Sequence, residues 1–292
     1  MSAIEARHGR VLIVGSGPGS ADLITLRGLR ALRQADVIFY DALVNPELLA
    51  EAAPEARKIF VGKRCGLPSI AQREINRRLV EDARAGNIVV RLKGGDPLLF
   101  GRGGEEALAC EEAGIQFEIV PGVTSALGAA SHSGIPLTHR GIASSVAFVT
   151  ARDGSGSEEQ IGRLGSLAAS VDTLAIFMGG SCLRSIVSSL TSAGLAGTTS
   201  VAVISNATME SQKTVLGTLE SIDAKVDQAS LVAPLLILVG AVTNLSSSLN
   251  WFERRTSGVS HQSPMFASAG AESGCATEKT ASRIVRVKGS MR

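Results

Sequence analysis

The chain has few aromatic residues, no excess of charge and no long hydrophobic run. Phe, Trp and Tyr make up 3% of the 292 residues, with a single Trp and a single Tyr, so a platform for stacking nucleic-acid bases is not expected. Lys and Arg number 29 and Asp and Glu number 27, which gives no basic surface for a phosphate backbone. The longest apolar run, residues 231–242, is too short to span a bilayer. Nucleic-acid and membrane partners are therefore not expected.

Cysteine and histidine are also scarce. The four cysteines stand far apart, at Cys65, Cys110, Cys182 and Cys275, which argues against a disulfide framework or a zinc knuckle. The four histidines have no metal-ligand spacing, so we expect no metal. The first residues lack the apolar segment of a signal peptide, and we expect a cytoplasmic protein.

What is present is a large apolar fraction, 45%, arranged in alternating short and long segments. β-branched runs predict strands at residues 11–14, 37–40, 59–61, 88–92, 117–120, 146–150, 173–177, 201–204 and 235–239. Helical spacing of apolar residues predicts helices at 26–34, 70–85, 105–113 and 183–192. This alternation indicates an α/β fold with mostly parallel sheets.

The strand–helix pattern restarts after a turn-rich joint at residues 134–141. We therefore expect an N-terminal α/β domain at 1–137 and a C-terminal α/β domain at 138–252. The segment 253–292 is rich in Ser, Gly, Ala and Thr without periodicity, which is typical of a disordered tail.

Two glycine-rich segments follow predicted strands. Residues 15–19, Gly-Ser-Gly-Pro-Gly, approach a dinucleotide fingerprint, but Ser20 stands where the third glycine belongs and Pro18 lacks an N–H. A nicotinamide site and a simple tight turn both stay open there. Residues 90–106 place Asp96, Arg102 and Glu105 around the end of a strand, where open sheets bind ligands.

Two further segments have the same placement. Residues 120–132 carry small side chains that allow close approach of a ligand or of another helix, and the sequence does not decide between them. Asp41 and Lys63 each follow a predicted strand; a solvated charge is the plain interpretation of either one, whereas both facing one cleft would make an acid–base pair.

Together these segments resemble the uroporphyrinogen-III C-methyltransferases, a family of tetrapyrrole methylases, over about residues 11–252. The matching motifs are Val-Gly-Ser-Gly-Pro-Gly (14–19), Tyr-Asp-Ala-Leu-Val (40–44), Val-Gly-Lys-Arg (61–64), Arg-Leu-Lys-Gly-Gly-Asp-Pro (91–97), Phe-Gly-Arg-Gly-Gly-Glu-Glu (100–106), Val-Pro-Gly-Val-Thr-Ser (120–125) and Gly-Ile-Pro-Leu-Thr-His-Arg (134–140).

The resemblance implies two α/β domains with the active site in the cleft between them, usually in a homodimer. It implies transfer of two methyl groups from S-adenosylmethionine to C2 and C7 of uroporphyrinogen III, giving precorrin-2 and S-adenosylhomocysteine for sirohaem, cobalamin or haem d1. A separate dehydrogenase–chelatase would then act downstream. The alternatives are another tetrapyrrole-family methylase with a different substrate, a nicotinamide-dependent oxidoreductase, and a catalytically silent tetrapyrrole carrier.

The resemblance also implies roles for particular residues. Asp41 matches the proton acceptor and Lys63 the proton donor, while Arg102, Glu105 and Arg140 match residues that hold the substrate or move its protons. The cofactor positions match Pro18, Gly94, Gly95, Asp96, Leu99, Thr124, Ser125, Met178 and Ala207.

The substrate's eight carboxylates call for several cations, because Arg and Lys bind carboxylates strongly. The candidates are Lys63, Arg64, Arg91, Lys93, Arg102, Arg140 and Arg152. The sequence departs from the family pattern in three segments. Residues 149–152 are Val-Thr-Ala-Arg where the family usually has Val-Thr-Gly-His, Phe177 stands where Tyr is frequent, and Ala207 stands where Gly is common.

Overall fold

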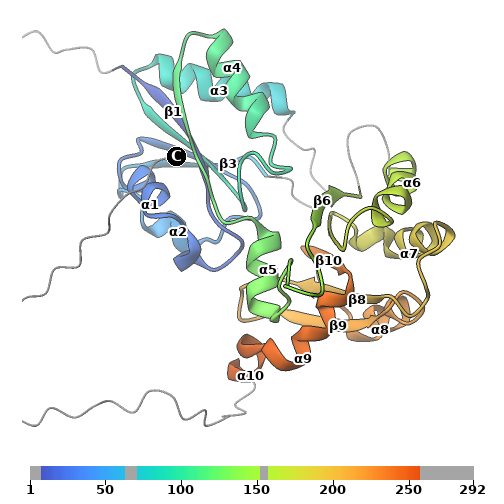
Figure 1. Ribbon diagram of the computed structural model, residues 1–292. Coiled ribbons are helices and arrows are strands. Elements are labelled where there is room, and N and C mark those ends of the chain that lie inside the picture. Colours follow the sequence, from blue (N-terminus) through green and yellow to red (C-terminus); the bar gives the residue numbers. More distant parts are fainter. Residues whose placement is uncertain (1–7, 63–70, 152–156, 257–292) are drawn as a thin grey trace, which may run out of the picture. The chain divides into compact units, whose positions relative to one another are not determined.

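The computed structural model describes residues 8–62, 71–151 and 157–256, which form two five-stranded sheets with helices on both faces of each (Figure 1). The first sheet has the order β3-β2-β4-β1-β5, and its strands pair in parallel throughout. Its strands are β1 (Arg10–Gly15), β2 (Val37–Tyr40), β3 (Arg57–Phe60), β4 (Ile88–Lys93) and β5 (Gln116–Val120).

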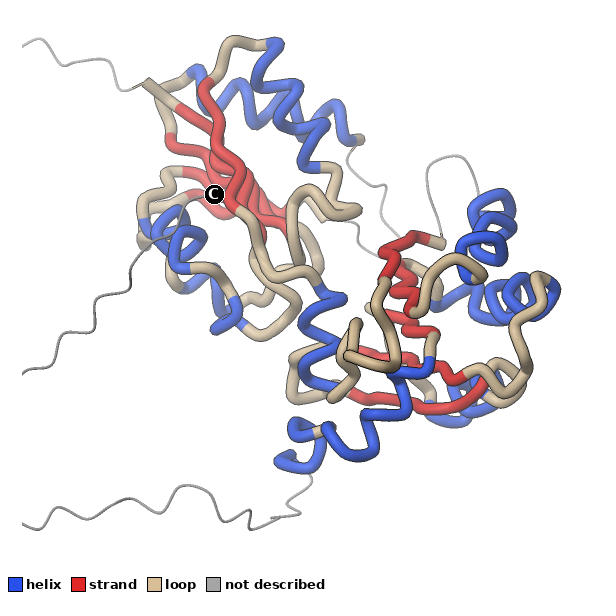
Figure 2. Tube along the Cα trace, viewed as in Figure 1, coloured by secondary structure: helices blue, strands red, loops and turns tan. Residues whose placement is uncertain are grey.

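Two layers of helices cover the first sheet, and they follow from the alternation of side chains along its strands. Leu12 and Val14 of β1 face α1 (Leu26–Arg33) and α2 (Glu47–Ala50). Val11 and Ile13 face α3 (Gln72–Arg84) and α4 (Gly103–Glu112) on the other side. Figure 2 shows the helices lying on both faces of this sheet. Because both faces of the sheet are covered, its central strands are buried runs, as parallel sheets require.

The second sheet has the order β6-β7-β10-β8-β9, and only β6 and β7 pair in parallel. Its strands are β6 (Val146–Thr150), β7 (Thr173–Phe177), β8 (Ser200–Ser205), β9 (Lys213–Thr218) and β10 (Leu235–Val239). The α/β class and all nine predicted strands are confirmed, but the expectation of a mostly parallel sheet is wrong here. Residues 206–212 join β8 to β9 and are too few for a parallel crossover, which needs about a dozen residues or more.

The second sheet is also covered on both faces. One face packs against α6 (Ser157–Ala168), α7 (Leu183–Ser192) and α8 (Ile222–Ala229). The other packs against α5 (Ser125–Ser133) and the apolar residues of the segment 135–143. Helix α5 therefore belongs to the core of the second sheet, although it directly follows the first sheet in the chain.

Short helices complete the described chain. They are η1 (Ala21–Leu23), η2 (Gly180–Cys182), η3 (Ala241–Leu245), α9 (Ser246–Leu249) and α10 (Trp251–Thr256). Helix α10 packs on α5, where Trp251 Nε1 donates to the Ser131 carbonyl at 2.8 Å. Of the expected tail at 253–292, the first residues belong to α10, and residues 257–292 lie outside the described part. None of the described helices has the length and apolar character needed to cross a bilayer.

The loops that leave β1, β4 and β5 meet backbone against backbone. Gly95 N–H donates to the Gly17 carbonyl at 2.7 Å, and Gly17 N–H returns a bond to Gly95 O at 3.3 Å. A Cβ at Gly122 would lie 2.2 Å from Gly95 O, and one at Gly15 would lie 2.6 Å from the Gly122 Cα. No side chain fits in these gaps, so glycine is required by close approach.

Replacing Gly122 by Ala should therefore force the loops apart, with a stability loss of at least about 1–3 kcal/mol from overpacking. The matched control is Gly104→Ala in α4, where a Cβ would meet nothing within 4 Å. That change should be neutral or stabilise by about 0.5–1 kcal/mol, because alanine favours the helix. Urea unfolding of both variants measures the difference, and equal stabilities would contradict the close approach.

A single carboxylate joins the starts of β6 and β7. Asp172 Oδ2 accepts hydrogen bonds from the backbone N–H groups of Ser144 and Ser145 at 2.8 and 3.0 Å, and from their hydroxyls at 3.0 and 2.8 Å. These bonds, the Ser144 N–H above all, hold the pKa of Asp172 below its ordinary value.

Because the folded-state pKa of Asp172 is lowered, its stabilisation is present above the unfolded pKa of about 4 and is lost as the pH falls through the folded value. Asp172→Asn should lower the free energy of unfolding at pH 7. As the pH falls, the free energy of unfolding should decrease less in this variant than in the wild type. The measurement is urea unfolding between pH 7 and pH 3. Asp227→Asn is the control, since that exposed carboxylate lies 3.8 Å from Arg184. Equal behaviour of the two variants would refute the prediction.

Candidate active site

Four segments converge beside the glycine contacts: the loops after β1, β4 and β8, and the start of α5. Gly95 has a positive φ of 68°. A Cβ added to it would lie 3.7 Å from the Ser125 N and 3.9 Å from the Thr124 Cα. Ser20 N–H donates to Thr208 Oγ1 at 2.9 Å, which ties the first loop to the loop after β8. The structure thus brings together most of the residues expected to hold the cofactor.

Pro18 and Ala207 occupy close-packed positions in this region. A Cβ at Gly128 of α5 would lie 2.5 Å from the Pro18 Cβ, so the proline ring rests on α5. A Cβ at Gly19 would lie 2.6 Å from the Ala207 carbonyl, and Ala207 is buried. Both residues therefore lie at the junction of these loops, and their cofactor role stays a prediction.

The loops after β7 and β8 contain strained backbone. Met178, Asn206 and Thr208 have φ values of 56°, 47° and 69°, which side chains other than glycine rarely adopt. Thr208 is β-branched and buried, and its N–H is held by Gln212 Oε1 at 2.8 Å. Strain of this kind gathers at ligand sites, where the surrounding contacts maintain it. Met178 itself is half exposed and follows Phe177.

The segment after β4 carries Gly94, Asp96 and Leu99. A Cβ at Gly94 would lie 2.7 Å from the Leu43 Cβ, so the Leu43 side chain packs directly against the main chain there. The two oxygens of Asp96 accept from Leu98 N–H at 2.8 Å and Gly122 N–H at 3.1 Å, which makes this carboxylate a brace between two loops. Leu99 is half buried, and the next residue, Phe100, stacks at 5.0 Å on Phe177.

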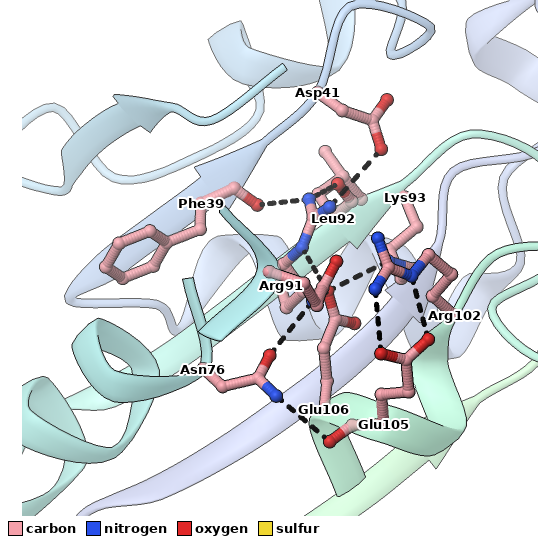
Figure 3. Close-up of polar contacts among 10 residues, drawn as sticks. Phe39, Asp41, Asn76, Arg91, Leu92, Lys93, Arg102, Glu105 and Glu106 are labelled. Carbon is pink, nitrogen blue, oxygen red and sulfur yellow. Dashed lines mark hydrogen bonds and ion pairs between the residues drawn. The ribbon is translucent and has the colours of Figure 1, made fainter. Parts of the chain in front are cut away.

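Asp41 follows β2 and lies beside an arginine (Figure 3). Its Oδ1 accepts from Leu43 N–H at 3.1 Å, and its Oδ2 lies 3.5 Å from Arg91 Nη2. The Asp41 side chain is 24% exposed, against 5% for Arg91. Its expected partner Lys63 lies outside the described residues, so the acid–base pair stays a prediction.

Arg91 and Lys93 do not face a substrate, contrary to the expectation that they hold carboxylates. Both are buried, because their positions on β4 point them at the α3–α4 layer. There Glu106 Oε1 accepts from Arg91 Nε at 2.9 Å and from Lys93 Nζ at 3.0 Å. Burial lowers the pKa of the Lys93 ammonium, and Arg91 lowers it further, against the opposing effect of Glu106.

Glu106, with Gln72 and Asn76 of α3, was missed by the sequence reasoning. Glu106 is fully buried, and Gln72 Nε2 donates to its Oε1 at 3.2 Å. Asn76 Nδ2 in turn donates to the Glu105 carbonyl at 3.2 Å. The one signal in the sequence is the spacing of Arg91 and Lys93, which are two residues apart in a predicted strand and therefore share one face of the sheet. Two cations on a buried face require an acidic partner.

Arg102 and Glu105 pair with each other at the start of α4 (Figure 3). Arg102 Nε and Nη2 each donate to one Glu105 oxygen at 2.8 Å, and both side chains are more than half exposed. The hydrogen bonds raise the pKa of Arg102 and lower the pKa of Glu105. Glu105 is thus a poor proton acceptor while this pair is intact.

Arg140 is exposed on a tight turn closed by two backbone hydrogen bonds of 2.9 Å between His139 and Ala143. Among the described residues, no ion pair joins Arg140 to the residues after β2 or β4. Arg64 and Arg152, like Lys63, lie outside the described ranges. Within those ranges, no group of three or more His, Cys, Asp and Glu side chains is arranged to hold a metal.

Comparisons with known proteins point in one direction. The chain is 46% identical over 253 residues to a sirohaem synthase of Zymomonas mobilis, and 47% identical over 253 residues to one of Klebsiella pneumoniae. These matches cover 86% and 87% of this chain but 52% and 53% of the relatives, so the chain spans about half their length.

Two solved structures are similar over most of the chain. A uroporphyrin-III C-methyltransferase of Thermus thermophilus, complexed with S-adenyl homocysteine, is 38% identical with a TM-score of 0.70, covering 81% of this chain and all of that one. A cobalt-precorrin-4 methyltransferase is 28% identical with a TM-score of 0.72, covering 83% and 99%. The model of the tetrapyrrole (corrin/porphyrin) methylases matches residues 10–223. With these loops and this two-sheet fold, the chain belongs to the tetrapyrrole methylase family.

Proposed function

We propose that this protein transfers methyl groups from S-adenosylmethionine to C2 and C7 of uroporphyrinogen III, giving precorrin-2 and S-adenosylhomocysteine. The observation that carries the proposal is the similarity to the T. thermophilus uroporphyrin-III C-methyltransferase along that protein's whole length. The seven motifs named above lie in the same region of the chain. Sirohaem, cobalamin and haem d1 are the end products this reaction would feed. The homodimer and the downstream dehydrogenase–chelatase stay predictions.

The residues present fit the methyl donor. At Gly95 a Cβ would meet nothing nearer than the Ser125 N at 3.7 Å, and the missing side chain lets a ligand approach the backbone closely. Thr124 and Ser125 begin α5, whose first N–H groups have no partner within the helix and can bind a polar ligand. Met178 is one of the residues with a positive φ, and Ala207 lies between two others, Asn206 and Thr208. When bound, S-adenosylmethionine supplies a methyl group on a cationic sulfur.

The chain's own work is to orient the substrate and to manage charge. Holding two reactants in line can contribute about 7–11 kcal/mol in favourable cases. Arg102 and Arg140 would each bind a substrate carboxylate, since guanidinium groups match carboxylates in shape and charge. A substrate carboxylate competing for Arg102 would release Glu105 from its ion pair.

Methylation of a pyrrole carbon leaves a positive charge on the ring system, so a proton has to leave. Asp41 would accept it, because its carboxylate is partly exposed at the end of β2. Glu105 is less suited, since Arg102 lowers its pKa. Lys63 is the residue proposed to donate a proton.

A second candidate is methylation of a later corrin intermediate. The structural similarity to the cobalt-precorrin-4 methyltransferase favours it, at a TM-score close to that of the T. thermophilus enzyme. The nicotinamide alternative has no such support, because Pro18 packs on α5 and offers no N–H.

The direct test is an anaerobic reaction of the purified protein with S-adenosylmethionine and freshly reduced uroporphyrinogen III, followed by mass spectrometry. We expect a gain of two methyl groups. The variant Gly95→Val, whose side chain would keep a ligand away from the main chain, is the negative control for background methyl transfer. No gain, while S-adenosylhomocysteine still binds, would reject uroporphyrinogen III and favour the second candidate.

Arg140→Ala should raise the KM for uroporphyrinogen III about ten- to a hundredfold, because a lost charge-assisted hydrogen bond contributes about 1.5–3 kcal/mol. The Kd for S-adenosylhomocysteine, measured by calorimetry, should stay unchanged. Arg30→Ala, an exposed arginine of α1, is the matched control and should alter neither value. Equal losses of substrate and cofactor binding would exclude the assigned role of Arg140.

A further inference from the structure

A cluster of charged side chains lies inside the first sheet's α3–α4 layer, directly behind Asp41. The side chains of Arg91, Lys93 and Glu106 are 5%, 4% and 0% exposed. Well-packed hydrophobic residues in place of a buried ion pair are often as stable or more so. Stability alone is therefore a weak reason for this cluster, and its position at the carboxyl end of β4 suggests another.

The Arg91 guanidinium is held on three sides. Nε donates to Glu106 Oε1 at 2.9 Å. Nη1 donates to the carbonyls of Leu92 and Phe39 at 2.8 and 3.4 Å. Because the guanidinium is planar and rigid, these bonds leave Nη2 one direction, and it lies 3.5 Å from Asp41 Oδ2 (Figure 3).

Glu106 in turn fixes the arginine from α4. Its Oε1 accepts from Arg91, Lys93 and Gln72, whereas its Oε2 is buried with no hydrogen-bond partner among the described atoms. A buried carboxylate that satisfies only one oxygen is costly, and such groups call for an explanation beyond packing. The single engaged oxygen faces the arginine that reaches Asp41.

We propose that Glu106 and Arg91 are positioning residues, and that together they fix the orientation of the Asp41 carboxylate for the reaction. The proposal rests on the proposed function where it concerns turnover, but the orientation itself is a property of the folded chain. Two contacts define the Asp41 carboxylate: Leu43 N–H on Oδ1 and the Arg91 guanidinium on Oδ2. Glu106 touches Arg91 and not Asp41, so it acts on Asp41 through Arg91.

The test compares Arg91→Lys, Glu106→Gln and the double variant with the wild type. Lysine keeps the charge, but its single ammonium nitrogen cannot occupy the separate positions from which Nε, Nη1 and Nη2 of the guanidinium donate. Glutamine keeps the shape and the acceptor at Oε1 but removes the charge. Ile75→Val is the matched control, because Ile75 is buried on α3 in the same helical layer and its apolar side chain cannot hydrogen-bond to the cluster. Thermal unfolding confirms that each variant is folded.

The first readout does not depend on catalysis. The carboxyl carbon-13 resonance of Asp41, assigned by its loss in Asp41→Asn, is compared among the variants at one pH. We expect it to shift in Arg91→Lys and in Glu106→Gln, and to stay in place in Ile75→Val. An unmoved resonance in both cluster variants would overturn the proposal, whatever the protein's substrate.

The second readout is single-turnover methyl transfer. We expect the rate to fall about ten- to a hundredfold in Arg91→Lys, as misplacement of a reacting group does, with unchanged Kd for S-adenosylhomocysteine. Glu106→Gln should lose less, and the double variant should be no slower than Arg91→Lys, because both residues act along one route. Additive losses would overturn the route. If the wild type transfers no methyl group to uroporphyrinogen III, the proposed function is rejected. The resonance experiment would still test the orientation of Asp41, because it does not depend on catalysis.

Discussion

The candidate site depends on how closely three main-chain loops approach one another. Gly15, Gly95 and Gly122 bring the ends of β1, β4 and β5 within distances that exclude any side chain. This contact fixes where Asp96 braces the loops and where α5 begins. The mixed second sheet then adds its strained turns to the same region, through the bond between Ser20 and Thr208.

The charged residues divide into two groups with different tasks. Arg102, Glu105 and Arg140 are exposed, so they are available to a substrate and contribute little to folding. Arg91, Lys93 and Glu106 are buried and balance one another inside the protein. Asp41 shares a feature of each group, because its carboxylate is partly exposed and a buried arginine lies behind it.

The sequence predicted the fold well wherever local pattern decides structure. Buried β-branched runs located nine strands, but β9 was missed, since it contains Gly217 and none of its residues is fully buried. The pairing direction in the second sheet was wrong because it depends on loop length and not on strand composition. Most residues that the motifs match to the cofactor lie on loops that the structure brings together, and their role stays a prediction. The expectation that Arg91 and Lys93 bind substrate carboxylates is wrong, because a charge in the sequence does not reveal which way its side chain faces in a sheet.

Helix α5 has a consequence for how the chain comes into being. Ala126, Ala129 and Ala130 pack against the second sheet, yet the helix is synthesised before any strand of that sheet. During translation the apolar side of α5 stays unpaired until β7, β8 and β10 have been made. The residues on that side include small alanines. Because this helix exposes little apolar surface before the sheet forms, it offers little area for non-native contacts or for chaperone binding. The small residues that suit a ligand at one end of α5 thus also suit delayed docking along its length.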